Sequence, residues 1–529
     1  MSKKRPGHKY KPGSLGNDYD AIVVGSGMGG LSTAAILAKA GKKVLVLERH
    51  YTPGGFTQSY TRKGYEWDVG VHYLGKVHDR GAVLRRVFDY ITESSLEWAK
   101  LADVYDRLVF DDATHDCVSG RERFEVALIE AFPGEADAIR QYMRLIVDVE
   151  QSSQNFFLER ALPPWLGTCV YPFLARKFRR YSDRSTLDVL RGLTGHNKLI
   201  GVLTGQYGDY GLPPGQSSFA MHGLLAEYYL EGANYPIGGG SRIARGVEAV
   251  IERAGGRIVV NAEVAEVLIR RERAIGVRLA NNDEITAPVV VSDIGLRNTL
   301  TKLVPGSKCA DKLRRRMRQV GASTSHICLY VGFKESNQAM HFNSTQYWVL
   351  PGYDHDSNVA RYLADPQARM PLVWITFPSA KDPEWDRRYP GRATLTAVTL
   401  ASYDWFSRWR GTEWHKRGTE YDDFKEQFAQ RLLAEVYRQV PQAKGKVDYY
   451  ELSTPLSTQH FCNHSRGEIF GLELSPTRFQ QRWLRPHLPI KNLYLCGQDI
   501  VTNGVGASAI SGVLTASAIL QRNVLKDIL

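Results

Sequence analysis

The fold is decided by residues 20–48, which read DAIVVGSGMGGLSTAAILAKAGKKVLVLE. The apolar run 19–24 predicts a buried strand, residues 28–40 predict a helix rich in alanine and leucine, and residues 43–48 predict a second apolar strand. Gly41 ends the helix. A strand, a helix and a strand in this order predict one βαβ unit of an α/β fold.

The turn from the first strand into the helix carries the pattern G-x-G-x-x-G, from Gly25 to Gly30. Gly25 permits the tight turn, Gly27 lets a pyrophosphate approach the backbone, and Gly30 lets the helix pack close to the strand. The free N–H groups at the helix start attract phosphate. Glu48 ends the second strand about 20 residues further on, where a carboxylate binds ribose hydroxyls and repels a 2′-phosphate. These residues predict a dinucleotide site, and the alternative is a glycine-rich turn without a ligand.

Two further segments favour a flavin dinucleotide. Gly54 and Gly55 follow the second strand, and such a pair suits the long pyrophosphate–ribityl arm, which must pass close to the backbone. Near the other end, a strand predicted at 492–496 leads through Gly497-Gln498-Asp499 into an uncharged helix that ends near residue 520. The positive end of this helix would stabilise a reduced anionic flavin, and Asp499 would bind ribityl hydroxyls. An ordinary turn and a capped buried helix are the alternatives.

The nucleotide-like segments form three blocks, separated by two long stretches of mixed character. We expect a discontinuous Rossmann-type FAD-binding domain from residues 15–90, 232–305 and 455–529, with a mixed α+β substrate domain from residues 91–231 and 306–454 inserted into it. In the middle block, a helix at 243–253 and strands at 257–260, 264–270 and 276–279 precede a strand that ends at Val291. Residues 1–14 are basic and contain glycine and proline, which predicts a flexible tail.

Composition narrows the class of protein. The chain has 529 residues, 43% hydrophobic and 23% charged, which is typical of a globular protein of two or three domains. Its six cysteines include no C-x-x-C pair, so we expect a reducing compartment and no metal site.

The formal charge of +12 suits an anionic partner, but no recognition module accompanies it and we expect no nucleic acid. No apolar run reaches the roughly 18 residues of a spanning helix, so the expected location is cytoplasmic.

An anionic membrane surface is a second expected partner. Residues 156–180 place Trp165, Phe173 and other aromatic residues beside a basic cluster at 176–180. Aromatic residues next to cations are typical of a segment that docks on anionic headgroups. The alternative is a helical cap over a substrate tunnel, with a solvated basic end.

Residues 20–75, including Val69-Gly70-Val71-His72-Tyr73-Leu74-Gly75, resemble the superfamily of flavoproteins that contains phytoene desaturases, carotenoid isomerases and retinol saturases. Segments 206–214 (QYGDYGLPP) and 492–502 (NLYLCGQDIVT) are similar to retinol saturases. The resemblance is thin at 80–200 and 330–450. It implies an amine oxidase or phytoene desaturase type of FAD fold, with Val264 contacting adenine through its backbone. The residues that it implies for FAD binding are Gly25, Ser26, Gly27, Gly29, Gly30, Glu48, Arg49, Gly54, Gly55, Phe56, Thr57, Gly497 and Asp499.

The resemblance implies hydride chemistry at a carbon–carbon double bond of a hydrophobic polyene or unsaturated lipid, such as a retinoid or carotenoid. The leading expectation is saturase-type reduction, in which flavin N5 delivers a hydride to one carbon and an acid protonates the other. Desaturation and flavin-dependent cis–trans isomerisation are the alternatives. Electrons are expected from an external donor, or to leave to an external acceptor, because no second strand–G-x-G-x-x-G–helix unit follows.

The expected proton donors are His72 and Tyr73, which lie just after the flavin-binding block. A second group of candidates consists of Tyr207, Asp209 and Tyr210. Each of these side chains has an alternative role as a hydrogen-bonded structural residue. Three other histidines are expected to be structural, with the first of them hydrogen-bonded in the core: His326, His460 and His464.

Two rival classes of protein remain. An amine-oxidase-type flavin enzyme would share the fold and would need an aromatic cage before the flavin. A non-enzymatic carrier, as the GDP dissociation inhibitors are on a related scaffold, would lack flavin. The intact phosphate glycines together with Glu48 argue against the carrier.

Overall fold

The predicted βαβ unit is present in the computed structural model, which describes residues 5–529. Strand β2 (Ala21–Val24) lies parallel to β3 (Val44–Glu48), and α1 (Met28–Lys39) connects them. Almost every residue of the three elements is buried. Their apolar composition therefore reflects a central position in the fold, as the sequence predicts.

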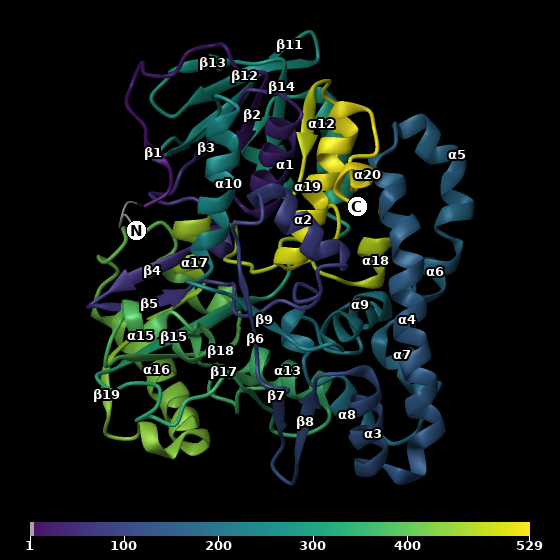
Figure 1. The fold of residues 1–529 in the computed structure, drawn as a ribbon, viewed down its shortest axis with the longest axis vertical. Coiled ribbons are helices and arrows are strands. Elements are labelled where there is room, and N and C mark those ends of the chain that lie inside the picture. Colours follow the sequence, from purple (N-terminus) through teal and green to yellow (C-terminus); the bar gives the residue numbers. More distant parts are fainter. Residues whose placement is uncertain (1–4) are drawn as a thin grey trace.

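The unit belongs to a six-stranded parallel sheet in the order β1-β10-β3-β2-β14-β20 (Figure 1). Helices α1, α10 and α19 pack together over it, and the sheet β11-β12-β13 contacts it through β14. Three separate blocks of the chain supply its strands, which confirms the expected α/β class. The remaining elements of this domain are β1 (His8–Lys9), α10 (Ser241–Arg253), β10 (Arg257–Val260), β11 (Val264–Arg270), β12 (Arg273–Leu279), β13 (Glu284–Thr286), β14 (Val289–Ser292), β20 (Leu493–Leu495) and α19 (Val505–Leu520).

The second domain is built on a seven-stranded sheet in the order β19-β15-β18-β17-β16-β7-β8. All neighbours are antiparallel except β16 and β7. Both predicted insertions contribute strands to this sheet, so this second domain is itself discontinuous. Its strands are β7 (Val104–Val109), β8 (Thr114–Val118), β15 (Ser325–Phe333), β16 (Gln346–Val349), β17 (Val373–Thr376), β18 (Ala393–Ala401) and β19 (Val447–Ser453).

A column of helices runs along one side of both domains (Figure 1). Its longest member, α4, packs against α9 and continues through a short turn into α5. Among residues 5–529, no helix is both long enough and apolar enough to cross a membrane. The column includes α3 (Arg121–Ala131), α4 (Ala136–Leu158), α5 (Pro164–Leu174), α6 (Arg176–Ser182) and α9 (Phe219–Tyr229).

The described part of the tail departs from its prediction. Strand β1 pairs with β10 at the edge of the parallel sheet, and the Gly7 N–H donates to Glu248 at 2.6 Å. Residues 1–4 lie outside the described residues. A flexible tail is therefore wrong for residues 5–14, because the unpaired backbone groups of β10 at the sheet edge bind this segment.

The hairpin of β4 (Ser59–Arg62) and β5 (Tyr65–Asp68) lies inside the predicted FAD segment 15–90 but packs on the second sheet. Its Trp67 indole donates to the carbonyl of Val331 at 3.2 Å, and its buried aromatic face covers Cys328 and Tyr330. The hairpin therefore ties the first domain to the second.

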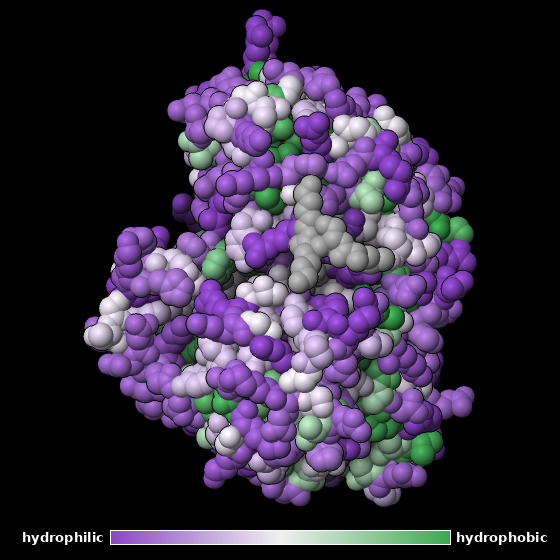
Figure 2. Space-filling view, turned by 60° about the vertical axis from the view of Figure 1, so that its left-hand side comes forward, coloured by the Kyte–Doolittle hydropathy of each residue, from purple (hydrophilic) through white to green (hydrophobic). Residues whose placement is uncertain are grey.

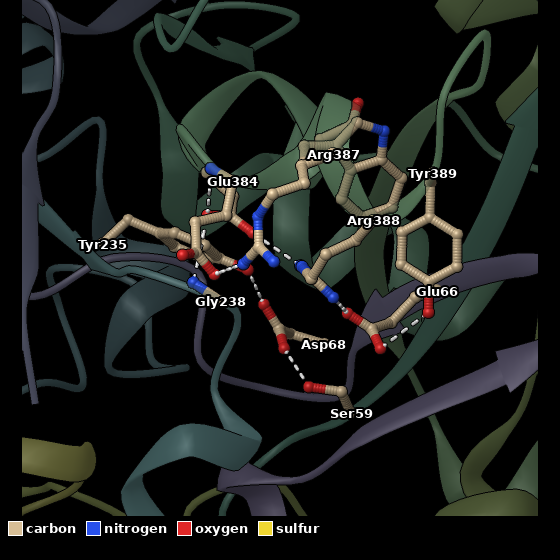
Figure 3. A network of polar contacts seen from close by, with 12 residues as sticks. Ser59, Glu66, Asp68, Tyr235, Gly238, Glu384, Arg387, Arg388 and Tyr389 are labelled. Atoms are coloured by element: carbon tan, nitrogen blue, oxygen red, sulfur yellow. Dashed lines mark hydrogen bonds and ion pairs between the residues drawn. The ribbon is translucent and has the colours of Figure 1, made fainter. Parts of the chain in front are cut away.

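A buried polar network extends this tie (Figure 3). Asp68 accepts hydrogen bonds from Ser59 and Tyr235, and Glu66 accepts one from Arg388 at 2.5 Å. The same Arg388 side chain donates to Asp382 at 2.5 Å. Glu66 of the first domain and Arg388 of the second thus form a partly buried ion pair that links the two domains.

The outer surface is mostly hydrophilic on the face shown in Figure 2, where hydrophobic residues form only small separate patches. That distribution is ordinary for a folded chain, so this face of the surface does not itself indicate a functional site.

Replacing Arg388 by methionine should lower the free energy of unfolding by about 3 kcal/mol or more, because Asp382 would stay buried without its cation. The matched control is Arg387→Met, which removes an exposed ion pair with Glu384 and should cost about 1 kcal/mol or less. Urea denaturation followed by circular dichroism compares the two, and equal losses would contradict this role of Arg388.

Candidate functional site

One cavity of about 1500 Å³ extends from the carboxyl end of the parallel sheet into the second domain. At one end it is lined by the glycine turn after β2, and at the other by Trp348, Leu372, Trp374 and Val398 of the second domain. The carboxyl ends of parallel strands are the usual ligand-binding edge of such sheets. The cavity therefore joins a nucleotide-type edge to an apolar pocket.

The glycine turn is closed in by neighbouring chain segments. Gly25 has a φ of +95°. A Cβ atom at Gly27 would lie 2.5 Å from Oδ2 of Asp293, and one at Gly29 would lie 2.5 Å from the backbone nitrogen of Gly497. At Gly30 a Cβ would lie 2.7 Å from the carbonyl oxygen of Gly25. No acidic residue occupies the first turn of α1, so the helix start keeps its attraction for an anion.

Glu48 is held at the cavity wall by three hydrogen bonds. Its Oε2 accepts from the Ser26 backbone N–H at 3.0 Å and from the Ser26 hydroxyl at 2.5 Å. Its Oε1 accepts from the His50 N–H at 2.7 Å. Oε1 therefore keeps a second acceptor site, which a ribose hydroxyl could use.

The residues after β3 fold back on the glycine turn. Gly54 has a φ of +121° and its N–H donates to the Ser26 hydroxyl at 3.1 Å. Gly55, Phe56 and Thr57 form a short 3₁₀ turn that also lines the cavity. Arg49, whose direction the sequence leaves open, donates to the carbonyls of His460 and Phe461.

The C-terminal segment has the predicted order of strand, loop and helix. Gly497 and Asp499 line the cavity, and α19 begins at Val505, after the cap Gly504 with a φ of +91°. The start of α19 also lines the cavity. The two carboxylate oxygens of Asp499 accept from the N–H groups of Leu296 and Leu472 at 2.7 and 3.0 Å. Asp499 thus fastens two loops at the cavity wall, and Val264 lines the cavity at the start of β11.

Asp293 is a site residue that the motifs do not reveal. It follows β14 and lies against the glycine turn, where Cys496 contacts its Oδ1 at 3.3 Å. Burial raises the pKa of Asp293 to about 7, so its negative charge beside a phosphate-type site is reduced at neutral pH. Only its position directly after a third parallel strand could have identified Asp293 from the sequence.

Of the predicted proton donors, the structure brings His72 and Tyr73 to the cavity wall and leaves Tyr207 outside the lining. The His72 ring lies 4.6 Å from the Trp374 ring, edge to face. Burial and the nearby Lys381 hold the pKa of His72 well below its usual value, which makes the imidazole neutral. Tyr207 is fully buried and its hydroxyl donates to the carbonyl of Pro371 at 3.2 Å.

Two histidines expected to be structural also line the cavity, His326 and His464. His326 lies on β15 and its Nδ1 has no hydrogen-bond partner within the described chain, so the prediction of a hydrogen-bonded core histidine is wrong. The reason is that the side chain faces the cavity. Burial lowers the pKa of His326 to about 4.

Comparison with known proteins shows to which family the chain belongs. A model of the NAD(P)-binding Rossmann-like domain family matches residues 23–91. The chain is 36% identical to all-trans-retinol 13,14-reductase of Danio rerio over 528 residues, which cover 96% of this chain and 87% of the relative. It is 25% identical to a chloroplastic prolycopene isomerase of an Oncidium hybrid cultivar, over 94% of this chain and 83% of the relative.

In structure, the chain is similar to putrescine oxidase solved with putrescine bound, with a TM-score of 0.62 over 95% of this chain and 99% of the other. The identity is only 16%, so this likeness shows the fold alone. It confirms the expected amine oxidase type of fold. From the sequence relatives, the chain belongs to the retinol saturase and carotenoid isomerase superfamily of oxidoreductases.

Proposed function

We propose that this protein is an FAD-dependent reductase of carbon–carbon double bonds in a retinoid or a similar polyene. The observation that carries the proposal is the single cavity that joins the glycine turn to an apolar pocket lined by Trp348 and Trp374. The relatives named all-trans-retinol 13,14-reductase support the substrate class. A bound flavin would supply the hydride.

The residues at the nucleotide end fit FAD. The glycine turn offers backbone N–H groups at the start of α1, and a Cβ at Gly27 or Gly29 would clash with Asp293 or Gly497 and displace the turn. Glu48 suits an adenosine ribose without a 2′-phosphate. Gly54 and Gly55 leave room beside the turn for a pyrophosphate arm, and the start of α19 faces the same cavity.

The residues at the other end would bind the alkene and exclude water. Trp348, Leu372, Trp374 and Val398 form an apolar wall, and His72 and Tyr73, which the sequence suggested as proton donors, lie beside it. Reduction requires a proton at the second carbon of the double bond. Electrons would come from an external donor, because the sequence has no second strand–G-x-G-x-x-G–helix unit.

Isomerisation is the second candidate function, and the likeness to a prolycopene isomerase favours it. It would use the same cavity with no net change in hydrogen content. Desaturation is the reverse reaction on the same residues. The amine oxidase and carrier alternatives are supported by the fold alone.

We also propose that α5 and α6 dock on an anionic membrane. Trp165 and Phe173 on α5 are 71% and 82% exposed, and α6 adds exposed cations at 176–180. Three partly exposed apolar residues that line the cavity mark its opening near this surface, and they are Val83, Leu158 and Leu529. Leu158 ends α4 directly before the turn into α5, so a lipid-dissolved substrate would enter beside the docked helices.

Gly27→Ala should lower the affinity for FAD by about tenfold or more, because its Cβ would displace Asp293 and distort the phosphate cradle. The control is Gly134→Ala, since no atom lies within 4 Å of a Cβ placed there. Flavin absorbance per mole of purified protein and titration of the apoprotein measure the effect. Full flavin content in Gly27→Ala would contradict the proposed site.

Anaerobically reduced protein mixed with all-trans-retinol should reoxidise its flavin and yield a product heavier by two hydrogens. Mass spectrometry with chromatography reads the product, and oxidised protein is the control. An unchanged mass with a shifted retention time would identify isomerisation instead. If neither occurs with retinoids, carotenoids or unsaturated fatty acids, the proposed function is wrong.

The double variant Trp165→Glu, Phe173→Glu should bind vesicles of phosphatidylcholine and phosphatidylserine about tenfold more weakly than the unaltered protein. The control is Val126→Glu, which alters an exposed apolar residue on α3, far from α5 (Figure 1). Vesicle sedimentation measures binding. Equal binding by both variants would exclude α5 as the docking helix.

A further inference from the structure

Two aspartates share one tyrosine hydroxyl at the wall of the cavity. The Tyr73 hydroxyl lies 3.0 Å from Oδ2 of Asp106 and 3.4 Å from Oδ2 of Asp209. Asp209 and Tyr73 line the cavity, whereas Asp106, on β7, is fully buried. Of the two carboxyl groups, only that of Asp209 is therefore within reach of a substrate in the cavity.

The two carboxyl groups have different surroundings. Asp106 accepts additional hydrogen bonds from Gln206 at 2.5 Å and from Gln346 at 3.1 Å. Oδ1 of Asp209 has no hydrogen-bond partner within residues 5–529. Donors favour a charged carboxylate, so the negative charge of the pair belongs on Asp106.

A buried lysine adds to this difference. Lys381 donates to Thr376 and to the main-chain oxygen of His72, both at 2.6 Å. Gln346 lies between it and Asp106, and its Oε1 is 3.4 Å from Nζ of Lys381. Burial lowers the pKa of Lys381 to about 7, so the lysine is partly charged at neutral pH, and its charged form stabilises the Asp106 anion through space.

Titration of the pair follows from this geometry. Burial raises the pKa of Asp106 to about 6, with its hydrogen bonds and Lys381 opposing the rise. Burial and the charge of Asp106 raise the pKa of Asp209 well above its usual value. Two carboxylates this close cannot both ionise readily, so one proton stays on the pair at neutral pH.

We propose that Asp209 is the catalytic acid that protonates the alkene and that Asp106 is the positioning residue that keeps the proton on Asp209. The inference rests on the proposed reductase function. The Asp209 O–H bond breaks as a C–H bond forms at one alkene carbon, while the other carbon gains the hydride that the reduced flavin supplies. The alkene thus gains two electrons and two hydrogens, and water that enters the cavity reprotonates Asp209 after the product leaves.

The other candidates are weaker acids. The imidazole of His72 is neutral because burial and Lys381 lower its pKa. Burial raises the pKa of the Tyr73 phenol well above its usual value, and Asp106 and Asp209 add to the rise. A neutral carboxyl group gives up a proton far more readily than either of them.

Asp209→Asn should slow the reduction of all-trans-retinol by about 100-fold or more, with flavin content and thermal midpoint retained, because an amide cannot supply the proton. The control is Asp116→Asn, which alters a half-exposed carboxylate paired with Arg107 on the β7–β8 hairpin. Single-turnover oxidation of the reduced flavin by retinol gives the rates. An Asp209→Asn rate within about threefold of the unaltered protein would overturn the inference.

The pH dependence of the reduction rate provides a second test, because a purely structural role of Asp106 would leave the pH profile unchanged. The acid must be protonated, so the rate should fall as pH rises through the pKa of Asp209. Asp106→Asn removes the neighbouring negative charge, lowers that pKa, and should shift the fall to lower pH by about one unit or more. The titratable groups that face Asp209 are Asp106 and Tyr105 on β7, Tyr73, Tyr210, and Tyr228 and Tyr229 on α9.

The outcomes separate the two proposals. If the unaltered protein does not reduce any polyene, the proposed function fails and the inference fails with it. If it does reduce retinol while the pH profile of Asp106→Asn is unchanged, the function stands and the role of the aspartate pair is wrong. If Asp209→Asn does not fold, the Asp106→Asn profile alone decides.

Discussion

The whole arrangement depends on the absence of side chains where three distant segments of the chain meet. A Cβ at Gly29 would lie 2.5 Å from the backbone of Gly497, and one at Gly27 would lie 2.5 Å from Asp293. Real Cβ atoms do not approach other atoms so closely, so any side chain here would push the glycine turn away from the ends of β14 and β20. This close packing creates the nucleotide-type edge and holds a discontinuous domain together.

The cavity changes its chemical character along its length. It begins at backbone N–H groups and Glu48, passes Trp348 and Trp374, and meets the cluster around Asp209 in the second domain. A dinucleotide and an apolar substrate need these two environments side by side. The tie through Arg388 keeps the two domains together, so the spacing between the two environments is fixed by the fold.

The sequence predicts the elements that local patterns encode and misses those that form only in three dimensions. The βαβ unit and the strands of the middle block lie within a few residues of their predicted bounds, because apolar runs and glycines mark them. Asp293 and His326 carry no motif, and they line the cavity because β14 ends there and β15 faces it. Asp106 carries no motif either, and it lies behind the cavity wall on β7. The pairing of β1 depends on a sheet edge, which single residues do not indicate.

A crystal structure with FAD and a non-reactive polyene bound is the decisive measurement. We expect the pyrophosphate at the N–H groups of residues 27–29, the flavin ring in the shared cavity, and the polyene between Trp374 and Asp209. A polyene bound outside this cavity, or a flavin ring that does not reach it, would show that the cavity is not the reaction site.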